Sequence, residues 1–232
     1  MQVLPQLKSF SCLCDHHRCR DLVQCVCRTG VTAPATSGTI RVLARRAKLL
    51  DDGNDDDDVF YKVDSGAVYT YKILSDGRRQ ITDLHFESEY FGLETGDRQS
   101  FLAHAVVDTR LSVIARDRLE LPCPSDAEFR YQVSSDTIRR LERAQRHILL
   151  LGRTTAQERV ATFLLDMAAR FSTKDHLHLP MSRSDIADFL GLTIETVSRT
   201  LTHLSREGVI GLAKNGRSIF LLKKKALQRL AV

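Results

Sequence analysis

The chain has 232 residues, of which 43% are hydrophobic and 27% are charged, and its formal net charge at pH 7 is +5. This length and composition suit two domains with sizeable cores plus a short leader. No apolar run approaches the length that spans a bilayer, and the N-terminus lacks the uninterrupted apolar core of a signal peptide. We therefore expect a cytoplasmic protein that does not enter the membrane.

Residues 1 to 35 form a cysteine-rich leader. Its cysteines are Cys12, Cys14, Cys19, Cys25 and Cys27, and Cys123 follows much later. Cytoplasmic thiols are normally reduced, so clustered thiolates indicate a metal or iron-sulfur site rather than a disulfide scaffold. Three interpretations are open: an iron-sulfur cluster, a zinc site that includes His16 or His17, and a flexible extension without a cluster.

Residues 36 to 124 alternate apolar and polar side chains in short runs that turn residues interrupt. The clearest hairpin joins residues 66–74 to residues 79–86 through Ser75-Asp76-Gly77-Arg78. This pattern is typical of an antiparallel β-barrel or roll, so we expect a β-roll as the first domain of an α+β protein.

Residues 125 to 152 are predicted to form one long helix with an apolar seam. The seam consists of Val133, Thr137, Leu141, Ala144, Ile148 and Leu151, which step by four, four, three, four and three residues. This spacing is close to the heptad of a coiled coil. Such a helix either lies on its own domain or pairs with the same helix of a second copy.

Residues 153 to 232 contain the most specific pattern of the chain, a helix-turn-helix at residues 183–202. Two helices joined in this way need a small residue where they cross, a turn residue that tolerates positive φ, and an apolar residue that holds the second helix. Ala187, Gly191 and Val197 meet these three needs.

The helix starts are also visible in the sequence. Ser182 and Asp185 have the spacing of a capping box, and Thr193 is placed to cap the second helix. An amphipathic helix over residues 154–171, opened by a threonine cap, is expected to precede them.

The second helix of the motif has an apolar stripe and a polar face. The polar face consists of Glu195, Ser198, Arg199 and Thr202, at i, i+3, i+4 and i+7. On a lone helix such a face is usually the solvated side, but the turn spacing favours a helix that reads bases. Arg can donate two hydrogen bonds to guanine, Glu can accept one from cytosine, and Ser can reach a base or a phosphate. We expect DNA contacts from Glu195, Ser198, Arg199, Ile194, Thr196, Thr193 and Ser182.

Two short strands over residues 209–222 are expected to flank Lys214-Asn215-Gly216, which is a strong hairpin signal. A hairpin after a recognition helix makes a winged helix-turn-helix, with Lys214 and Arg217 beside a phosphate. From residue 171 onward the sequence holds ten Lys and Arg but five Asp and Glu, so this part carries the whole net charge of +5. The run Lys223-Lys224-Lys225 alone would be a solvated end.

A helix-turn-helix that reads one half-site usually needs a partner, which favours a dimer interface at Thr137, Leu141, Ala144, Ile148 and Leu151. The alternative from another class is a scaffold dimer that does not bind DNA, but it leaves the helix-turn-helix pattern unexplained. The sequence has no glycine-rich phosphate loop, no nucleophile elbow and no zinc-protease motif, so we do not expect an enzyme.

The order of β-roll, dimer helix and winged helix-turn-helix, with the stretches at residues 148–163 and 191–199, resembles the Crp/Fnr transcription regulators, nearest the FixK and FnrN branch. The resemblance implies a homodimer in which Glu195, Ser198 and Arg199 read the TTGA half of a TTGAT-N4-ATCAA palindrome. It also implies an activator of microoxic or anaerobic respiration, denitrification or nitrogen fixation that recruits RNA polymerase. Cyclic AMP is not expected, because Leu93 follows Gly92 where cyclic-nucleotide binders place Glu.

The resemblance also bears on the cysteines, because Fnr-type oxygen sensors hold a [4Fe-4S] cluster with three N-terminal cysteines and one distal cysteine. It implies Cys14, Cys19, Cys25 and Cys123 as ligands if a cluster is bound. Cys19 and Cys25 have the spacing of the last two N-terminal ligands, whereas Cys14 lies two residues too far away, and the distal counterpart falls near Ser112. FixK proteins work without a cluster and are controlled chiefly by their own abundance.

Overall fold

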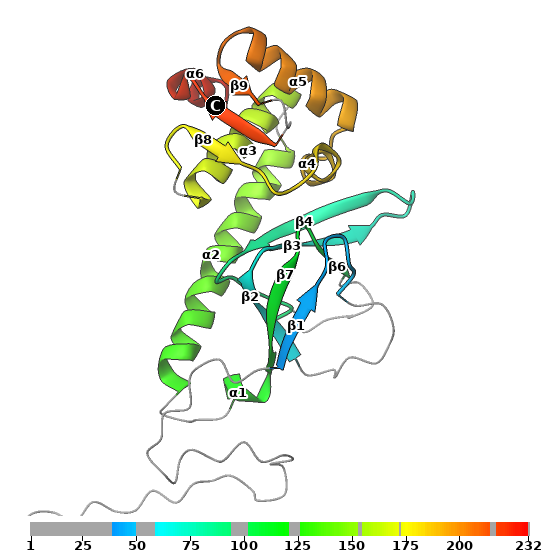
Figure 1. Cartoon of the computed structure of the whole chain (residues 1–232), viewed down its shortest axis with the longest axis vertical. Coiled ribbons are helices and arrows are strands. Elements are labelled where there is room, and N and C mark those ends of the chain that lie inside the picture. Colours follow the sequence, from blue (N-terminus) through cyan, green and yellow to red (C-terminus); the bar gives the residue numbers. More distant parts are fainter. Residues whose placement is uncertain are drawn as a thin grey trace, which may run out of the picture.

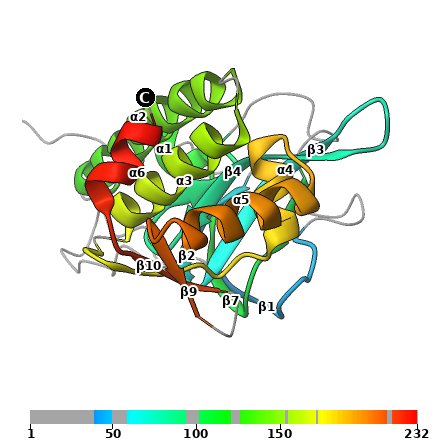
Figure 2. The same cartoon turned by 90° about the horizontal axis from the view of Figure 1, so that it is seen from above.

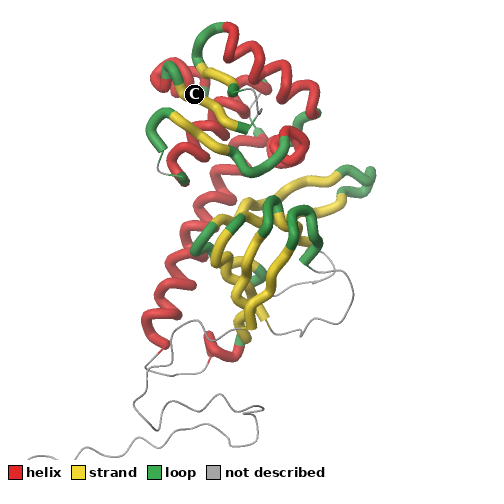
Figure 3. Tube along the Cα trace, viewed as in Figure 1, coloured by secondary structure: helices red, strands yellow, loops and turns green. Residues whose placement is uncertain are grey.

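The computed structural model describes residues 39–49, 59–93, 102–120, 126–152, 155–171, 173–213 and 217–231. Within these ranges the chain forms a β-roll, a long helix beside it and a C-terminal domain of helices with a small sheet (Figures 1 and 3). The α+β architecture expected from the sequence is thus confirmed. The predicted leader and Cys123 lie outside the described residues.

In its described part, the β-roll consists of two antiparallel sheets. The strands are β1 Thr39–Leu43, β2 Val59–Ser65, β3 Ala67–Ile73, β4 Arg79–Phe86, β5 Tyr90–Phe91, β6 Leu102–Ala105 and β7 Thr109–Ala115. One sheet has the order β1-β7-β2-β5 and the other β4-β3-β6. Alternate side chains such as Val63, Val68 and Leu111 are fully buried in a shared core, as the period of two requires.

The hairpin predicted between residues 66 and 86 is confirmed. Strands β3 and β4 pair from Ala67 opposite Phe86 to Ile73 opposite Arg79. The turn is closed by hydrogen bonds between Leu74 and Arg78 and between Gly77 and Leu74. In Figure 1 this long hairpin reaches out from the roll and passes beneath the C-terminal domain.

A short helix, α1 (Asp117–Glu120), precedes the long helix α2 (Ala127–Leu151). One face of α2 lies on its own roll, where Phe129 and Val133 are buried against Phe60 and Tyr90. The Tyr90 backbone N–H donates to Asp136 Oδ2 at 2.9 Å. Val133, the first residue of the predicted apolar seam, thus lies on its own domain, which is one of the two arrangements that the sequence left open.

The C-terminal domain continues with α3 Ala156–Arg170, β8 His176–His178, α4 Arg183–Leu190, α5 Ile194–Arg206, β9 Ile210–Leu212, β10 Ser218–Leu221 and α6 Lys224–Leu230. The predicted pairing of two wing strands is confirmed as β9 with β10, and β8 adds a third strand on the other side of β10. The predicted tip, residues 214–216, lies outside the described residues.

The basic run at residues 223–225 is exposed, as expected for a solvated segment, but it leads into a helix that packs on the domain. Lys224 and Lys225 begin α6, and Leu227 in this helix is fully buried. Helix α6 lies against α3, as the two views in Figures 1 and 2 show. Burial of the Leu227 side chain thus holds α6 against the domain although the helix begins with lysines.

A hydrophobic core runs from the roll into the C-terminal domain. The Phe86 ring of β4 meets the Phe171 ring after α3 edge to face, with 4.7 Å between the ring centroids. Burial of such rings packs the C-terminal domain directly on the roll. Among the described residues, no helix is both long and apolar enough to cross a membrane.

Candidate nucleic-acid interface

The first helix of the motif, α4, begins with the predicted capping box. The Asp185 backbone N–H donates to Ser182 Oγ at 3.2 Å, and the Ser182 backbone N–H donates to Asp185 Oδ2 at 2.9 Å. The Ser182 hydroxyl also donates to Asp185 Oδ2 at 2.7 Å. This hydroxyl therefore already serves the helix cap, so its predicted DNA contact would have to use a remaining lone pair on Oγ.

The turn between α4 and α5 has the predicted geometry. Gly191 takes φ of +62°, in the left-handed region that favours glycine, and a Cβ there would come within 3.4 Å of the Leu151 side chain. Ala187 and Val197 are buried where the two helices cross. Ala187, Gly191 and Val197 therefore have the packing and backbone roles that the sequence predicted for them.

The second helix, α5, begins at the predicted cap. Thr193 Oγ1 accepts from the Thr196 backbone N–H at 3.3 Å, and the two hydroxyls lie 3.0 Å apart. Glu195 is exposed in the first turn, where its own backbone N–H and the Thr193 hydroxyl lower the pKa of its carboxyl. An ionised carboxylate there is an acceptor only, which suits a cytosine amino group.

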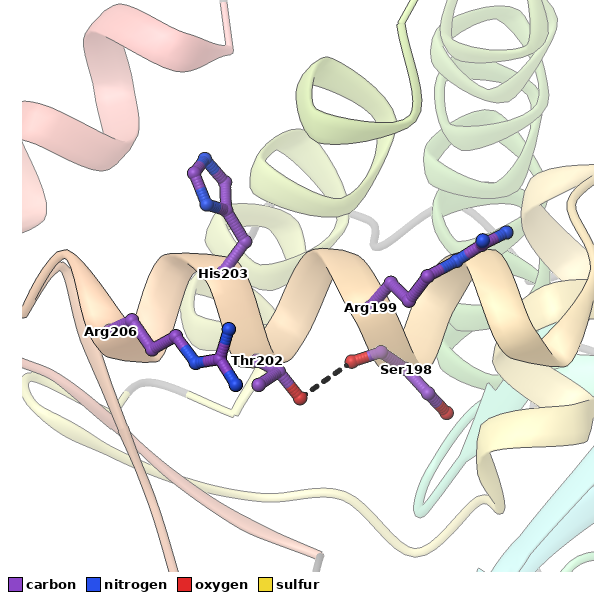
Figure 4. A pocket seen from close by; sticks show the side chains of 5 residues that line it. All are labelled: Ser198, Arg199, Thr202, His203 and Arg206. Carbon is purple, nitrogen blue, oxygen red and sulfur yellow. Dashed lines mark hydrogen bonds between the residues drawn. The ribbon is translucent and has the colours of Figure 1, made fainter.

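The polar face of α5 is exposed or half-buried, whereas Val197, Leu201 and Leu204 are buried on the opposite side. The face borders an open groove of about 330 Å³, lined by Ser198, Arg199, Thr202, His203 and Arg206 (Figure 4). Thr202 Oγ1 donates to the Ser198 backbone carbonyl at 2.9 Å, which holds that side chain flat against the helix. Arg199 and Arg206 bring the guanidinium donors to this groove.

His203 and Arg206 were not among the residues expected from the sequence. Both are exposed, and each continues the predicted polar face by one further turn, at i+4 from Arg199 and from Thr202. The predicted motif ended at residue 202, whereas α5 extends to Arg206. The i+4 repeat was therefore the signal that could have found them.

Residues 158–230 match the Crp-like helix-turn-helix domain. The chain is 46% identical over 201 residues to the nitrogen fixation regulation protein FixK of Azorhizobium caulinodans, covering 84% of this chain and 80% of the relative. The chain belongs to the Crp/Fnr family of transcription regulators, in its FixK-like branch. This Crp/Fnr regulator is also 33% identical over 226 residues to the transcriptional activatory protein AadR of Rhodopseudomonas palustris, covering 92% of this chain and 94% of the relative.

The solved structure of FixK2 from Bradyrhizobium japonicum resembles this Crp/Fnr regulator over most of its length. The two share 39% sequence identity and superpose with a TM-score of 0.74. The likeness covers 84% of this chain and 98% of the FixK2 chain. The match extends beyond the helix-turn-helix and includes the β-roll and long helix expected from the sequence.

The β-roll of this Crp/Fnr regulator holds its helix-turn-helix through Arg79 on β4. The Arg79 guanidinium pairs with Asp185 at 2.9 Å and donates from Nε to Asp188 Oδ2 at 2.8 Å. A further Arg79 N–H donates to the Tyr69 hydroxyl on β3. Because Asp185 also closes the capping box, one carboxylate links the start of α4 to the roll.

The other end of α4 is held as well. The last carbonyls of a helix lack partners within it. Here they accept from three other elements: Gln80 Nε2 donates to the Asp188 carbonyl at 2.7 Å, His147 Nε2 lies 2.8 Å from the Phe189 carbonyl, and Arg159 Nη1 donates to the Leu190 carbonyl at 3.1 Å. The His147 and Phe189 rings also stack at 4.0 Å. Strand β4 and helices α2 and α3 thus fix the C-terminal end of α4.

Of the predicted dimer residues, Thr137, Leu141, Ala144 and Ile148 are exposed, and Leu151 is partly buried against the core of its own chain. The same side of α2 exposes Tyr131, Ile138 and Leu149, which the heptad reading left out. Leu141 and Ile148 are 59% and 69% exposed, so α2 carries an apolar surface that its own roll does not cover.

The described residues contain none of the six cysteines, so the ligand set of Cys14, Cys19, Cys25 and Cys123 lies outside them. At the counted position of the distal ligand, the Ser112 hydroxyl donates to Asp64 Oδ2 at 2.8 Å. A hydroxyl bound to a carboxylate does not fit an iron-sulfur cluster, which needs a thiolate. The structure therefore offers no ligand at that position, and a cluster would depend on Cys123.

Leu93, which led us not to expect cyclic AMP, follows Gly92 at the end of β5. Its side chain packs on the cluster around Phe60 and Tyr90, and Arg116 donates to the backbone carbonyls of both Gly92 and Leu93. The next residues, 94–101, lie outside the described part of the chain. The absence of cyclic AMP binding stays a prediction.

Proposed function

We propose that this FixK-like regulator binds a palindromic site of the form TTGAT-N4-ATCAA as a homodimer. The proposal also makes it an activator of genes for microoxic or anaerobic respiration, denitrification or nitrogen fixation. The observation that carries it is the exposed polar face of α5 with Glu195, Ser198 and Arg199, opposite a buried apolar stripe. The similarity to proteins named as nitrogen fixation regulators supports the choice of target genes.

The proposed base contacts follow from side-chain chemistry. The Arg199 guanidinium would donate two hydrogen bonds to guanine O6 and N7, and Glu195 would accept from cytosine N4. Ser198, which is short and lies between them on the helix, would reach a base or a phosphate. Ile194, Thr196, Thr193 and Ser182 would meet the backbone at the start of α5 and at the cap of α4.

His203 and Arg206 extend the proposed interface along α5. Both carry side chains that can donate to phosphate oxygens, and they lie one turn beyond Arg199 and Thr202. Contacts of this kind set affinity and register but carry no sequence information. Base reading would therefore be concentrated in the first two turns of α5.

The proposed homodimer joins through α2, with Leu141 and Ile148 at its centre. Their exposure, and that of Ile138 and Leu149, supports an interface on this side of the helix. Two-fold symmetry would place two α5 helices in successive major grooves about 34 Å apart. Recruitment of RNA polymerase completes the proposed mode of activation.

A titration of labelled duplexes followed by fluorescence anisotropy tests the DNA-binding proposal. We expect the palindrome to bind at least about 1,000-fold more tightly than a scrambled duplex of equal composition, at one stated salt concentration. Equal affinity for both duplexes would show that α5 does not read sequence. A transcription assay with purified RNA polymerase then tests activation.

A second candidate function, direct oxygen sensing, is favoured by the spacing of Cys19 and Cys25. In this proposal Cys14, Cys19, Cys25 and Cys123 would hold a [4Fe-4S] cluster that oxygen destroys. The Ser112 side chain counts against it, because it provides no thiolate at the distal position. Iron and sulfide analysis of protein purified without air distinguishes the two functions.

A further inference from the structure

A small cavity lies where the β-roll, the long helix and the C-terminal domain meet. Its volume is about 60 Å³. It is lined from β4 by Thr82 and Asp83, from α2 by Arg143, Ala144, Arg146, His147 and Leu150, from α3 by Thr162, Phe163, Asp166 and Arg170, and from α4 by Phe189. We call it the arginine cavity, because three guanidinium groups line it.

Several residues that line this cavity carry hydrogen-bond donors without a partner. Among the described residues, seven buried side-chain nitrogen and oxygen atoms have no hydrogen-bond partner. Four of the seven belong to residues that line the arginine cavity: Nε and Nη2 of Arg143, Nε of Arg170 and Oγ1 of Thr162. A buried donor left unpaired is costly, so such a cluster needs an explanation.

The pattern on Arg143 is specific. Nε and Nη2 form one edge of the guanidinium, and this edge is the fork that binds an oxyanion through two parallel hydrogen bonds. The remaining nitrogen of the Arg143 guanidinium, Nη1, forms an ion pair with Glu89 Oε1 at 3.4 Å. In Arg170 only Nε is without a partner, because Nη2 is bound to Glu89 at 2.8 Å and to the Leu84 carbonyl at 2.7 Å.

The carboxylates nearby are already neutralised. Asp83 Oδ2 accepts from Arg140 Nε at 3.0 Å, and Glu89 is shared by Arg143 and Arg170. Desolvation alone would raise the pKa of Asp83, but the neighbouring His85 and the positive charges of Arg140, Arg143 and Arg170 hold it below its usual value. Counting Arg146 and Asp166 as well, the cluster has four guanidinium groups and three carboxylates, so it can accept one negative charge.

We propose that the arginine cavity binds one small oxyanion between the edge of Arg143, Nε of Arg170 and the hydroxyl of Thr162. The volume is on the order of two water molecules, which suits an anion of few atoms and excludes a nucleotide. An oxyanion has lone pairs for all three N–H donors and also brings the negative charge that balances the excess guanidinium. This inference does not depend on the proposed DNA site.

Nitrate and inorganic phosphate are the probes that test this proposal. The thermal unfolding midpoint of the full chain is measured as chloride is replaced by either probe at constant ionic strength. A ligand that binds only the folded state raises the midpoint with a saturable dependence on its concentration. We expect at least one probe to do so, whereas a general salt effect rises without saturation.

Two variants link such an effect to the cavity. Thr162→Val keeps the shape and charge of the site but removes one donor, so the apparent affinity should fall about tenfold. Arg143→Lys keeps the charge but removes the fork, and we expect a loss of the same order or greater. Arg139→Lys is the matched control, because Arg139 is exposed on the same helix and donates to Ser135.

Thr162→Val should fold, because it deletes a hydroxyl that has no partner, and its stability in chloride should equal or exceed that of the wild type. If Arg143→Lys does not fold, the apparent affinity of Thr162→Val compared with that of the wild type still tests the site. Saturable stabilisation of the wild type and Arg139→Lys, weakened in Thr162→Val, supports the site. The same dependence in all proteins, or no saturable effect of either probe, overturns it.

Discussion

The guanidinium of Arg79 in the β-roll and the carboxylate of Asp188 in α4 form an ion pair between residues 109 positions apart, with Nε donating to Oδ2 at 2.8 Å. Each side chain is only about one-quarter exposed, at 25% and 26%. A partly buried, hydrogen-bonded pair of this kind is stronger than a surface ion pair. The first helix of the helix-turn-helix is therefore tied to the roll by an arginine that lies outside the DNA-binding domain.

We expect Arg79→Ala to lower the free energy of unfolding by about 1 to 3 kcal/mol, because Asp188 and Asp185 lose a charged partner. Hydrogen exchange of the α4 amides should rise at the same time. Arg78→Ala is the matched control: its side chain is 77% exposed and pairs only with half-exposed Asp76 among the contacts described, so we expect at most about 0.5 kcal/mol. Equal effects of the two variants would show that the contact with α4 contributes nothing.

Arg199→Ala should cost about 1 to 3 kcal/mol in binding to the palindrome and relax the preference at one guanine position, because a base contact through two hydrogen bonds is lost. Arg206→Ala, on the same helix, should weaken binding to all duplexes alike and reduce the dependence on salt. Anisotropy titrations on single-base variants of the site measure both effects. A uniform loss for Arg199→Ala would instead assign that side chain to phosphate.

Charged substitutions on α2 should abolish the dimer. Leu141→Asp or Ile148→Asp places an unpaired charge in the proposed interface, and we expect sedimentation of a monomer in analytical ultracentrifugation. Ile73→Asp is the control, since Ile73 is 54% exposed but lies on the β3–β4 hairpin. Should the α2 variants stay dimeric, the interface lies elsewhere.

The stability of the protein should fall between pH 6.5 and pH 4 because of His85. This side chain is fully buried, its ring stacks on Phe91, and burial lowers its pKa from 6.5 to about 4. In this pH range the unfolded chain binds a proton that the folded chain does not, so the free energy of unfolding drops as the pH falls. The full effect is about 3 kcal/mol at pH 4.

His85→Gln should flatten this dependence. Asp136, whose pKa burial raises, contributes with the opposite sign, but it is present in both proteins and cancels in the comparison. Urea titrations at several pH values measure the two curves. Parallel curves for the wild type and the variant would mean that His85 does not titrate in this range.

We expect DNA binding to be insensitive to air, as for a regulator controlled by its own abundance. Protein purified without air should carry no iron or sulfide, and Cys19→Ser should bind the palindrome as the wild type does. Iron and sulfide analysis, followed by titrations before and after exposure to air, measures this. A cluster that is lost in air together with DNA binding would establish the oxygen-sensing alternative instead.

The helix-turn-helix was predictable because its signals are local. The cap at Ser182 and the turn at Gly191 involve residues within a few positions of one another, and only a few residue types meet those demands. Strand β8 and helix α6 gave weaker signals. Strand β8 has only three residues, and the single buried Leu227 of α6 follows a run of lysines.

The heptad of α2 did not show which apolar residues face a second copy. A long helix with two apolar faces has apolar residues at the same spacing on both. Val133 shares the seam spacing with the predicted dimer residues but is buried on the roll, and the exposed Ile138 was overlooked. Contacts between distant residues, such as Arg79 with Asp188, leave no local pattern at all. The cavity donors Arg143 and Thr162 belong to two helices and were equally invisible.

The last three carbonyls of α4 accept hydrogen bonds from β4, α2 and α3, and Arg159 Nη1 reaches the Gly191 carbonyl at 3.4 Å as well. The orientation of α5, which follows α4, is thus set by contacts with the roll, α2 and α3. In the proposed homodimer this arrangement would hold the two α5 helices at one separation, which sets the spacing between half-sites that the protein accepts. A palindrome with one base pair more or less in its centre would bind poorly although every base contact remained available, because the contacts of α4 with β4, α2 and α3 oppose a change in the distance between the two α5 helices.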